Sequence, residues 1–219
     1  IPPELQLEDE FYAVLGHLMG KVARDRIPVI DGLVTPPRED QFKALGAAAS
    51  ASGTVALFPV VGHTPEARTL EAALHGDDPE DTFPVTMNAL RSSREELTTT
   101  TGDALDMVIL GSPHFSLAEF RRLAPLLEDR RRHPSVQFLV TSSRAMVELA
   151  RGAGVIGTLE QFGGRVTVDT CILASPMLGS SIKRLMTNSA KYAYYSPGLL
   201  DAEIAFGSLA DCVQSAVEG

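Results

Sequence analysis

The chain has 219 residues, of which 44% are hydrophobic, so it can bury the core of one large domain or two small ones. Its formal net charge is -9 and its longest basic run is Arg130-Arg131-Arg132, which argues against nucleic-acid binding because that needs clustered positive charge. No stretch approaches the roughly 20 apolar residues that cross a bilayer, and no secretory signal opens the chain. We therefore expect a cytoplasmic protein that acts on a small molecule, without a nucleic-acid or membrane partner.

The predicted elements begin with an amphipathic helix, in which apolar residues recur at helical spacing from Phe11 to Val22. Short β-branched runs then alternate with helical segments. The predicted strands cover 27–30, 55–61, 107–110, 136–140, 165–168, 184–186 and 203–206. The predicted helices cover 39–52, 65–75, 87–97, 116–129, 143–151, 155–162 and 208–218. This alternation predicts an α/β fold with mostly parallel sheets and helices on both faces.

Two strands, 55–61 and 107–110, are apolar throughout, as expected of central strands that helices cover on both faces. Polar surface crossings predict a division into a first α/β half at 1–100 and a second at 101–219, built as two similar subdomains. The chain opens at Ile1 without a methionine, and we expect it to be one piece of a longer polypeptide.

Polar clusters follow six of the apolar runs. They lie at 62–66, 111–114, 141–144, 169–171, 187–189 and 207–208. Ligands of open α/β sheets bind beyond the carboxyl ends of the strands, so the sequence predicts one shared ligand-binding rim. The segment 187–198 is predicted as a turn-rich stretch between two strands, and its amide, hydroxyl and ammonium donors suit a carboxylate or phosphate.

Several of these residues also have a purely structural interpretation. Thr64, Ser116 and Ser208 each begin a helix-capping pattern. The histidines His63 and His114 are interpreted either as hydrogen-bonded scaffolding or as ligand contacts. The two cysteines match no metal-binding spacing, so they are interpreted either as buried thiols or as ligands.

A glycine pattern at 152–157 fits G-x-G-x-x-G, and Asp169 ends a later strand as a ribose-binding acid does. In a dinucleotide-binding fold, however, the glycines follow a strand directly, whereas a predicted helix intervenes here. We therefore expect these glycines to join two helices, and keep a nicotinamide-dependent oxidoreductase only as a weak alternative.

Seven blocks of the chain resemble the catalytic subunit or domain of the aconitase X family and occur in family order along nearly the whole chain. The specific blocks are Asp169-Thr170-Cys171 and Thr187-Asn188-Ser189-Ala190-Lys191-Tyr192. The others are Ile27-Pro28-Val29 with Asp31-Gly32, 43–48, 62–67, 111–114 with Ser116 and Glu119, and Gly207-Ser208 to Cys212 with Glu218-Gly219. One departure is Phe58-Pro59, where the family pattern has Phe-His.

This resemblance implies an aconitase-like dehydratase with an iron–sulfur cluster, acting on cis-3-hydroxy-L-proline or on mevalonate 5-phosphate. It implies that Cys171 and Cys212 ligate the cluster. A third ligand, the upstream substrate-binding segment and a small swivelling domain or subunit would lie outside this chain.

For the site, the resemblance and the residue chemistry together suggest roles. Lys191 is the candidate anchor for the substrate carboxylate or a proton-transfer group, Ser189 the candidate base and His114 the alternative acid or base. Expected substrate contacts are Thr187, Asn188, His63 and Thr64. The only other basic residues expected nearby are Arg144, Lys183 and Arg184, which slightly favours hydroxyproline over a phosphate. An alternative of another class is an anion-binding module without catalysis.

Overall fold

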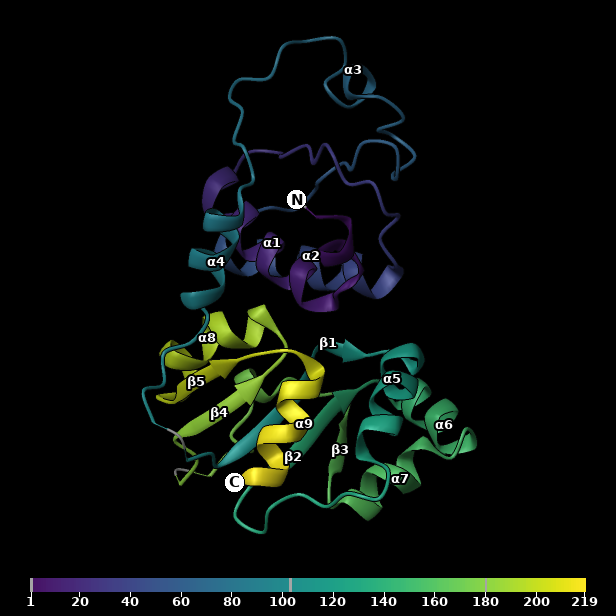
Figure 1. Ribbon diagram of the computed structural model, residues 1–219, viewed down its shortest axis with the longest axis vertical. Coiled ribbons are helices and arrows are strands. Elements are labelled where there is room, and N and C mark those ends of the chain that lie inside the picture. Colours follow the sequence, from purple (N-terminus) through teal and green to yellow (C-terminus); the bar gives the residue numbers. More distant parts are fainter. Residues whose placement is uncertain (1, 103, 180) are drawn as a thin grey trace. The chain divides into compact units, whose positions relative to one another are not determined.

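Figure 1 shows the computed structural model, which describes residues 2–102, 104–179 and 181–219. The chain divides into two compact units, Ile1–Glu95 and Glu96–Gly219. This division lies close to the boundary expected at residue 100. In the described ranges, no helix combines the length and the apolar composition needed to cross a membrane.

The first unit is helical. It contains the short 3-10 helix η1 (Pro3–Leu7), α1 (Asp9–Ala23), α2 (Glu39–Ser52), α3 (Leu70–Ala73) and α4 (Met87–Glu95). Its core is the pair α1 and α2, whose backbones touch at two glycines of α1. A β-carbon on Gly16 would lie 2.3 Å from the Leu45 carbonyl oxygen, and one on Gly20 would lie 2.5 Å from the Ala49 carbonyl oxygen. These positions therefore require glycine because the helices approach too closely for any side chain.

Three predictions for this unit are wrong. The predicted strands 27–30 and 55–61 reduce to a single parallel bridge between Ile30 and Val60. The helix predicted over 65–75 is confined to α3, which Thr69 caps. Thr64 is not a helix cap, because its hydroxyl accepts from Val60 N in a local turn. The two units are consequently not similar subdomains, since among the described residues only the second contains a sheet.

The second unit is an α/β domain around a five-stranded parallel sheet with the order β3-β2-β1-β4-β5. The strands are β1 (Met107–Phe115), β2 (Gln137–Ser142), β3 (Arg165–Val168), β4 (Arg184–Thr187) and β5 (Glu203–Phe206). The helices are α5 (Leu117–Leu127), α6 (Arg144–Gly152), α7 (Val155–Phe162), η2 (Ile172–Ala174), α8 (Ala190–Leu200) and α9 (Leu209–Glu218). This confirms the predicted α/β class, and β1 is the central strand, as its apolar run indicated.

Helices cover both faces of this sheet. Alternate residues of β1 and β2, including Val108, Leu110 and Val140, pack in a hydrophobic cluster with α5, α7 and α9, and Figure 1 shows α9 lying across the strands. Helix α8 contacts β1, β4, β5 and η2. It connects β4 to β5, whereas α5 connects β1 to β2 in the opposite direction along the sheet. Because parallel crossovers are right-handed, α8 lies on the other face.

Most other predictions for the second unit are confirmed, including the capping boxes at Ser116 and Ser208. Gly154, with φ of +78°, forms the N-cap of α7 directly after α6, so the glycine pattern at 152–157 is a helix junction. The main correction concerns the segment 187–198. Its predicted turn-rich stretch is instead largely helix α8, whose N-cap is Ser189.

Candidate functional site

The candidate site is the rim formed by the carboxyl ends of the strands in the second unit. We define the rim as residues 111–114, 141–144, 169–171, 187–191 and 207–208. The first of these segments interrupts the pairing of β1 with β2, since Leu110 pairs with Val140 but Phe115 pairs with Ser142. The four residues between them therefore bulge from the strand. Gly111 makes this possible with a φ of +97°.

Hydrogen bonds between neighbouring loops hold the rim together. The His114 ring nitrogen Nε2 donates to the Thr170 carbonyl over 3.0 Å. The Ser189 hydroxyl donates to the Ser112 carbonyl, and Gly207 N donates to the Thr187 carbonyl over 3.1 Å. The structure thus brings together the loops after β1, β3, β4 and β5, as the sequence predicted.

The amino end of α8 presents the hydroxyl, amide and ammonium groups of the rim. Ser189 N donates to Thr187 Oγ1 over 3.1 Å, and Ser189 Oγ accepts from Tyr192 N over 3.2 Å. Thr187 is fully buried, whereas Asn188, Ser189 and Lys191 are half-buried. Within the described residues, the Lys191 ammonium has no ion-pair partner, although it lies in the first turn of a helix, where the macrodipole disfavours a cation. An anion bound there would relieve this arrangement.

Two other basic residues expected near the rim lie elsewhere. Lys183 and Arg184 are at the amino end of β4, where they form ion pairs with Asp201 and Glu203 at 3.0 and 3.2 Å. They are therefore at the opposite edge of the sheet from the rim. Arg144 stays at the rim, because it begins α6 directly after β2.

Tyr192 directly follows the rim segment 187–191, and the sequence analysis assigned it no role. Its side chain is almost completely buried, and burial raises the pKa of its phenol to about 12. Hydrogen bonding to the Thr141 side chain and to the Ile172 backbone opposes this rise, and the nearby Cys171 adds to it. Residues three positions apart lie on the same side of a helix. The spacing of Tyr192 from Ser189 was therefore the sequence feature that could have placed Tyr192 beside the site.

Asp169 and Arg144 form an ion pair at the rim. Arg144 N donates to Asp169 Oδ1 over 2.9 Å, and its guanidinium donates to Oδ2 over 3.1 Å. The backbone hydrogen bond from Arg144, followed by its side chain, lowers the pKa of the exposed Asp169 carboxyl. The backbone of Asp169 has a positive φ of 52°. Its carboxylate joins the loop after β3 to the amino end of α6.

The two cysteines differ in exposure. Cys171 is exposed and begins the turn η2, which packs against α8. Cys212 is fully buried in the first turn of α9, among the cluster that includes Leu110 and Met186. Among the residues that the structure describes, no three His, Cys, Asp or Glu side chains form a group able to hold a metal ion. A complete set of metal ligands is therefore not found in this part of the chain.

His63 and Thr64 belong to the first unit, whereas the rim is defined within the second. The His63 ring nitrogen Nε2 donates to the Leu33 carbonyl over 2.9 Å. Thr64 closes the turn after Val60 through its hydroxyl. Both side chains thus make local hydrogen bonds that stabilise loops of their own unit.

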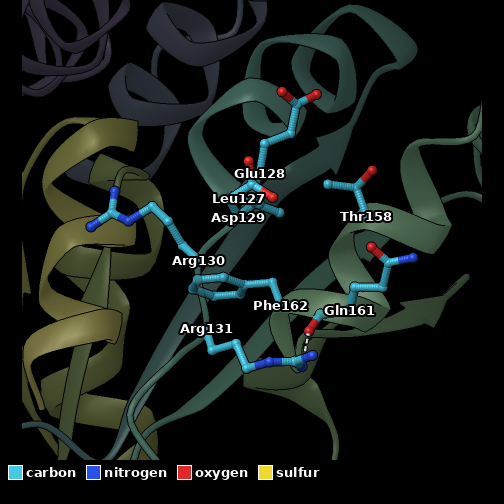
Figure 2. Close-up of a pocket in the computed structure, with 8 residues that line it drawn as sticks. All are labelled: Leu127, Glu128, Asp129, Arg130, Arg131, Thr158, Gln161 and Phe162. Carbon is cyan, nitrogen blue, oxygen red and sulfur yellow. Dashed lines mark hydrogen bonds between the residues drawn. The ribbon is translucent and has the colours of Figure 1, made fainter.

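One pocket in the second unit lies away from the rim, with a volume of about 410 Å³. Figure 2 shows its lining at the carboxyl ends of α5 and α7: Leu127, Glu128, Asp129, Arg130, Arg131, Thr158, Gln161 and Phe162. Arg131 donates to the Gln161 carbonyl, and Arg130 donates to Gln214 Oε1. These segments precede β2 and β3, so the pocket lies at the amino edge of the sheet and contains none of the candidate catalytic residues.

Two protein-family models match the chain, one in each structural unit. The model of the aconitase X second domain matches residues 3–95, and the model of the aconitase X third domain matches residues 105–218. The chain belongs to the aconitase X family. Each structural unit corresponds to one of these family domains.

Curated relatives carry two names. The chain is 45% identical over 216 residues to a cis-3-hydroxy-L-proline dehydratase of Pseudomonas aeruginosa. This match covers 97% of the chain and 37% of the Pseudomonas protein. It is 40% identical over 217 residues to the enzyme of the same name from Hypocrea jecorina, covering 97% and 36%. It is 33% identical over 216 residues to a phosphomevalonate dehydratase large subunit of Methanosarcina mazei, covering 99% and 51%. All these relatives are dehydratases, that is, hydro-lyases.

A solved structure agrees with this relationship. The chain superimposes on the crystal structure of Thermococcus kodakaraensis aconitase X in its holo-form with a TM-score of 0.82 and 30% identity, covering 94% of this chain and 51% of that one. The chain spans about a third to a half of the length of these relatives.

Proposed function

We propose that the complete protein to which this chain belongs is a hydro-lyase that dehydrates cis-3-hydroxy-L-proline to Δ1-pyrroline-2-carboxylate. The single observation that carries the substrate is the 45% and 40% identity to dehydratases of that name over 97% of the chain, against 28% to 38% to phosphomevalonate dehydratase large subunits. Because the chain spans only part of these relatives, the activity is assigned to the complete protein.

Positive charge at the rim supports the same substrate. Lys191 and Arg144 remain there, while Lys183 and Arg184 are paired at the opposite edge of the sheet. A carboxylate needs one cationic anchor, whereas a phosphate with two charges is usually held by several basic groups. The few basic residues at the rim therefore favour the amino acid over the phosphorylated substrate.

In the proposed site, Lys191 anchors the substrate carboxylate at the amino end of α8, with Asn188 as a further hydrogen-bond donor. Dehydration requires a base to take the proton from Cα and an acid to protonate the departing hydroxyl, so that the Cβ–O bond breaks and water leaves. Ser189 is the proposed base. Its hydroxyl is protonated and donates to the Ser112 carbonyl, so Ser189 must first lose this proton to solvent and act as the alkoxide. His114, whose Nε2 is held by Thr170, is the alternative acid or base.

The donor chemistry of the chain fits an iron–sulfur cluster in the complete protein. Thiols are the ligands that such clusters take, and Cys171 is exposed at the rim while Cys212 follows the end of β5 in the first turn of α9. We propose these two as protein ligands, with a third from outside the chain. When bound, an iron with an open coordination position supplies a Lewis acid for the substrate hydroxyl. The proposed partner is the remaining polypeptide or a small subunit, as the name "large subunit" of one group of relatives suggests.

The decisive experiment is product analysis with the complete protein, purified anaerobically with iron and sulfide, on cis-3-hydroxy-L-proline and on mevalonate 5-phosphate. Turnover of the first alone is expected. Turnover of the second alone would establish the phosphomevalonate alternative, and binding of either without product would favour a binding module. A colourless, metal-free but fully active enzyme would refute the cluster.

Lys191 is tested with a matched lysine. Lys191→Ala should raise KM for the hydroxy acid about 10- to 100-fold, in line with the loss of one charge-assisted hydrogen bond. Lys183→Ala removes an ammonium of the same chemistry from the opposite edge of the sheet and should leave KM unchanged. Equal effects of the two substitutions would remove Lys191 from the site.

A further inference from the structure

The first unit contains a parallel strand pair that stops after one bridge. Ile30 N donates to the Pro59 carbonyl and Val61 N donates to the Ile30 carbonyl, both over 2.9 Å. These are the two hydrogen bonds of a parallel bridge. The sequence predicts longer strands over 27–30 and 55–61, yet the observed pairing is limited to the bridge between Ile30 and Val60.

Two prolines explain why the pair cannot grow. In a parallel ladder the next two hydrogen bonds toward the amino ends would be donated by residues 28 and 59. Both are proline and have no backbone N–H. The segment 27–30 is therefore unable to pair with the residues before Pro59, whatever the conformation of the loops.

The segment Val55–Phe58 is consequently left with an open backbone. In the part of the chain that the structure describes, these four residues make no backbone-to-backbone hydrogen bond. Part of the segment is packed, because Val55 is buried and a β-carbon on Gly46 of α2 would lie 3.1 Å from the Phe58 ring. Leu57, in contrast, has a side chain that is 53% exposed. An apolar segment with unpaired backbone groups is a template for the addition of another strand.

The relatives indicate what supplies this strand. The two units match the second and third domains of aconitase X, and the relatives have about half to two thirds of their length outside the matched region. We propose that an extended apolar strand from this additional polypeptide of the complete protein pairs with residues 55–58. This pairing would complete the strand that the sequence predicts at 55–61. The strand leads directly into the turn of His63 and Thr64, so the added strand would also fix the position of that turn.

Hydrogen–deuterium exchange with mass spectrometry on the complete protein tests the pairing. The amides of 55–58 are expected to exchange at least about 100-fold more slowly than those of residues 78, 80, 81 and 83 in the irregular segment 77–83, which donate no hydrogen bond within the described residues and serve as the internal reference for unprotected backbone. Exchange of 55–58 as fast as that of 77–83 would overturn the proposal. Protection that rises with protein concentration, together with dimers on gel filtration, would assign the edge to a second copy and overturn it as well.

A pair of leucine variants tests the apolar side of the same edge. Leu57→Lys in the complete protein should increase exchange at 55–58 at least tenfold. Leu149→Lys, at a position in α6 with the same 53% exposure, should leave that exchange unchanged. Equal exchange in the two variants would contradict the docking of Leu57. If Leu57→Lys does not fold, the wild-type comparison with 77–83 decides the question, and turnover enters neither measurement.

Discussion

Gly111 is the position at which a single methyl group should disturb both the sheet and the rim. A β-carbon there would lie 2.1 Å from the Thr141 carbonyl oxygen and 2.9 Å from the Thr141 hydroxyl, and the φ of +97° is one that alanine adopts only with strain. Strain of roughly 1–3 kcal/mol and overpacking of a similar amount together predict a loss of about 2–6 kcal/mol for Gly111→Ala. The clash is with backbone, so it is relieved only by separating β1 from β2.

Thermal and urea unfolding of the 219-residue chain measure this loss. For a chain of this size, about 2–6 kcal/mol corresponds to a fall in Tm of roughly 4–24 °C. Gly157→Ala is the matched control, since Gly157 is inside α7 and no heavy atom lies within 4 Å of its added β-carbon. It should be neutral or slightly stabilising, because alanine is the better helix former. A Gly111→Ala chain within about 0.5 kcal/mol of the wild type would refute the steric argument.

Three further predictions concern the groups around the rim. In the chain without metal, the exposed Cys171 should react rapidly with a thiol reagent, whereas the buried Cys212 should react only on unfolding. Equal reaction rates of the two thiols would show that Cys212 is not buried. The raised pKa of Tyr192 predicts that stability present below pH 10 falls by roughly 3 kcal/mol in all as the pH rises from below 10 to above 12, because the unfolded chain loses the proton first. Tyr192→Phe should abolish this fall in alkaline unfolding curves. The lowered pKa of Asp169 predicts that its carboxylate stabilises the fold at a pH above the pKa of the unfolded chain, and that this stabilisation disappears as the pH falls through the pKa of the folded state. The wild type and Asp169→Asn should therefore differ in Tm at pH 7 and converge in acid. A difference in Tm that does not depend on pH would exclude the carboxylate charge as its cause.

The second unit was largely predictable because its apolar runs find partners within the unit. The predicted strand 165–168 and helix 155–162 have the bounds observed for β3 and α7. Helix α8 was missed because its tyrosines, serine and Pro197 are poor helix formers. Its formation depends on capping by Ser189 and on burial of one side of the helix against the sheet, and neither is visible in local propensity.

The first unit shows the limit of the same reasoning. The strands predicted at 27–30 and 55–61 have the right composition, but a strand exists only when its backbone is paired. Pro28 and Pro59 prevent the two segments from pairing beyond Ile30 and Val60. Composition therefore predicted where strands are preferred, but it did not predict whether a partner strand is available to pair with them.

For the candidate site, the parallel sheet alone was enough to predict the rim, because the carboxyl ends of parallel strands share one edge. Individual contacts were not predictable. Ser189 meets Ser112, and His114 meets Thr170, only because β1 lies between β2 and β4 in the sheet. The sequence places these residues far apart, and the order of strands depends on packing of the whole unit.

The order of the strands also constrains how two thiols can bind one cluster. Cys212 packs with Leu110 on the α9 face, whereas Cys171 begins the turn that packs on α8 at the other face. The sheet separates the two faces, and Cys171 and Cys212 both lie in segments that follow the carboxyl ends of strands, at the rim. If both thiols bind one cluster, as proposed, the metal would have to lie beyond the strand ends, at the rim where Lys191 has no ion-pair partner among the described residues. The proposed thiols, the proposed anchor and a ligand from the rest of the protein would then meet in that region.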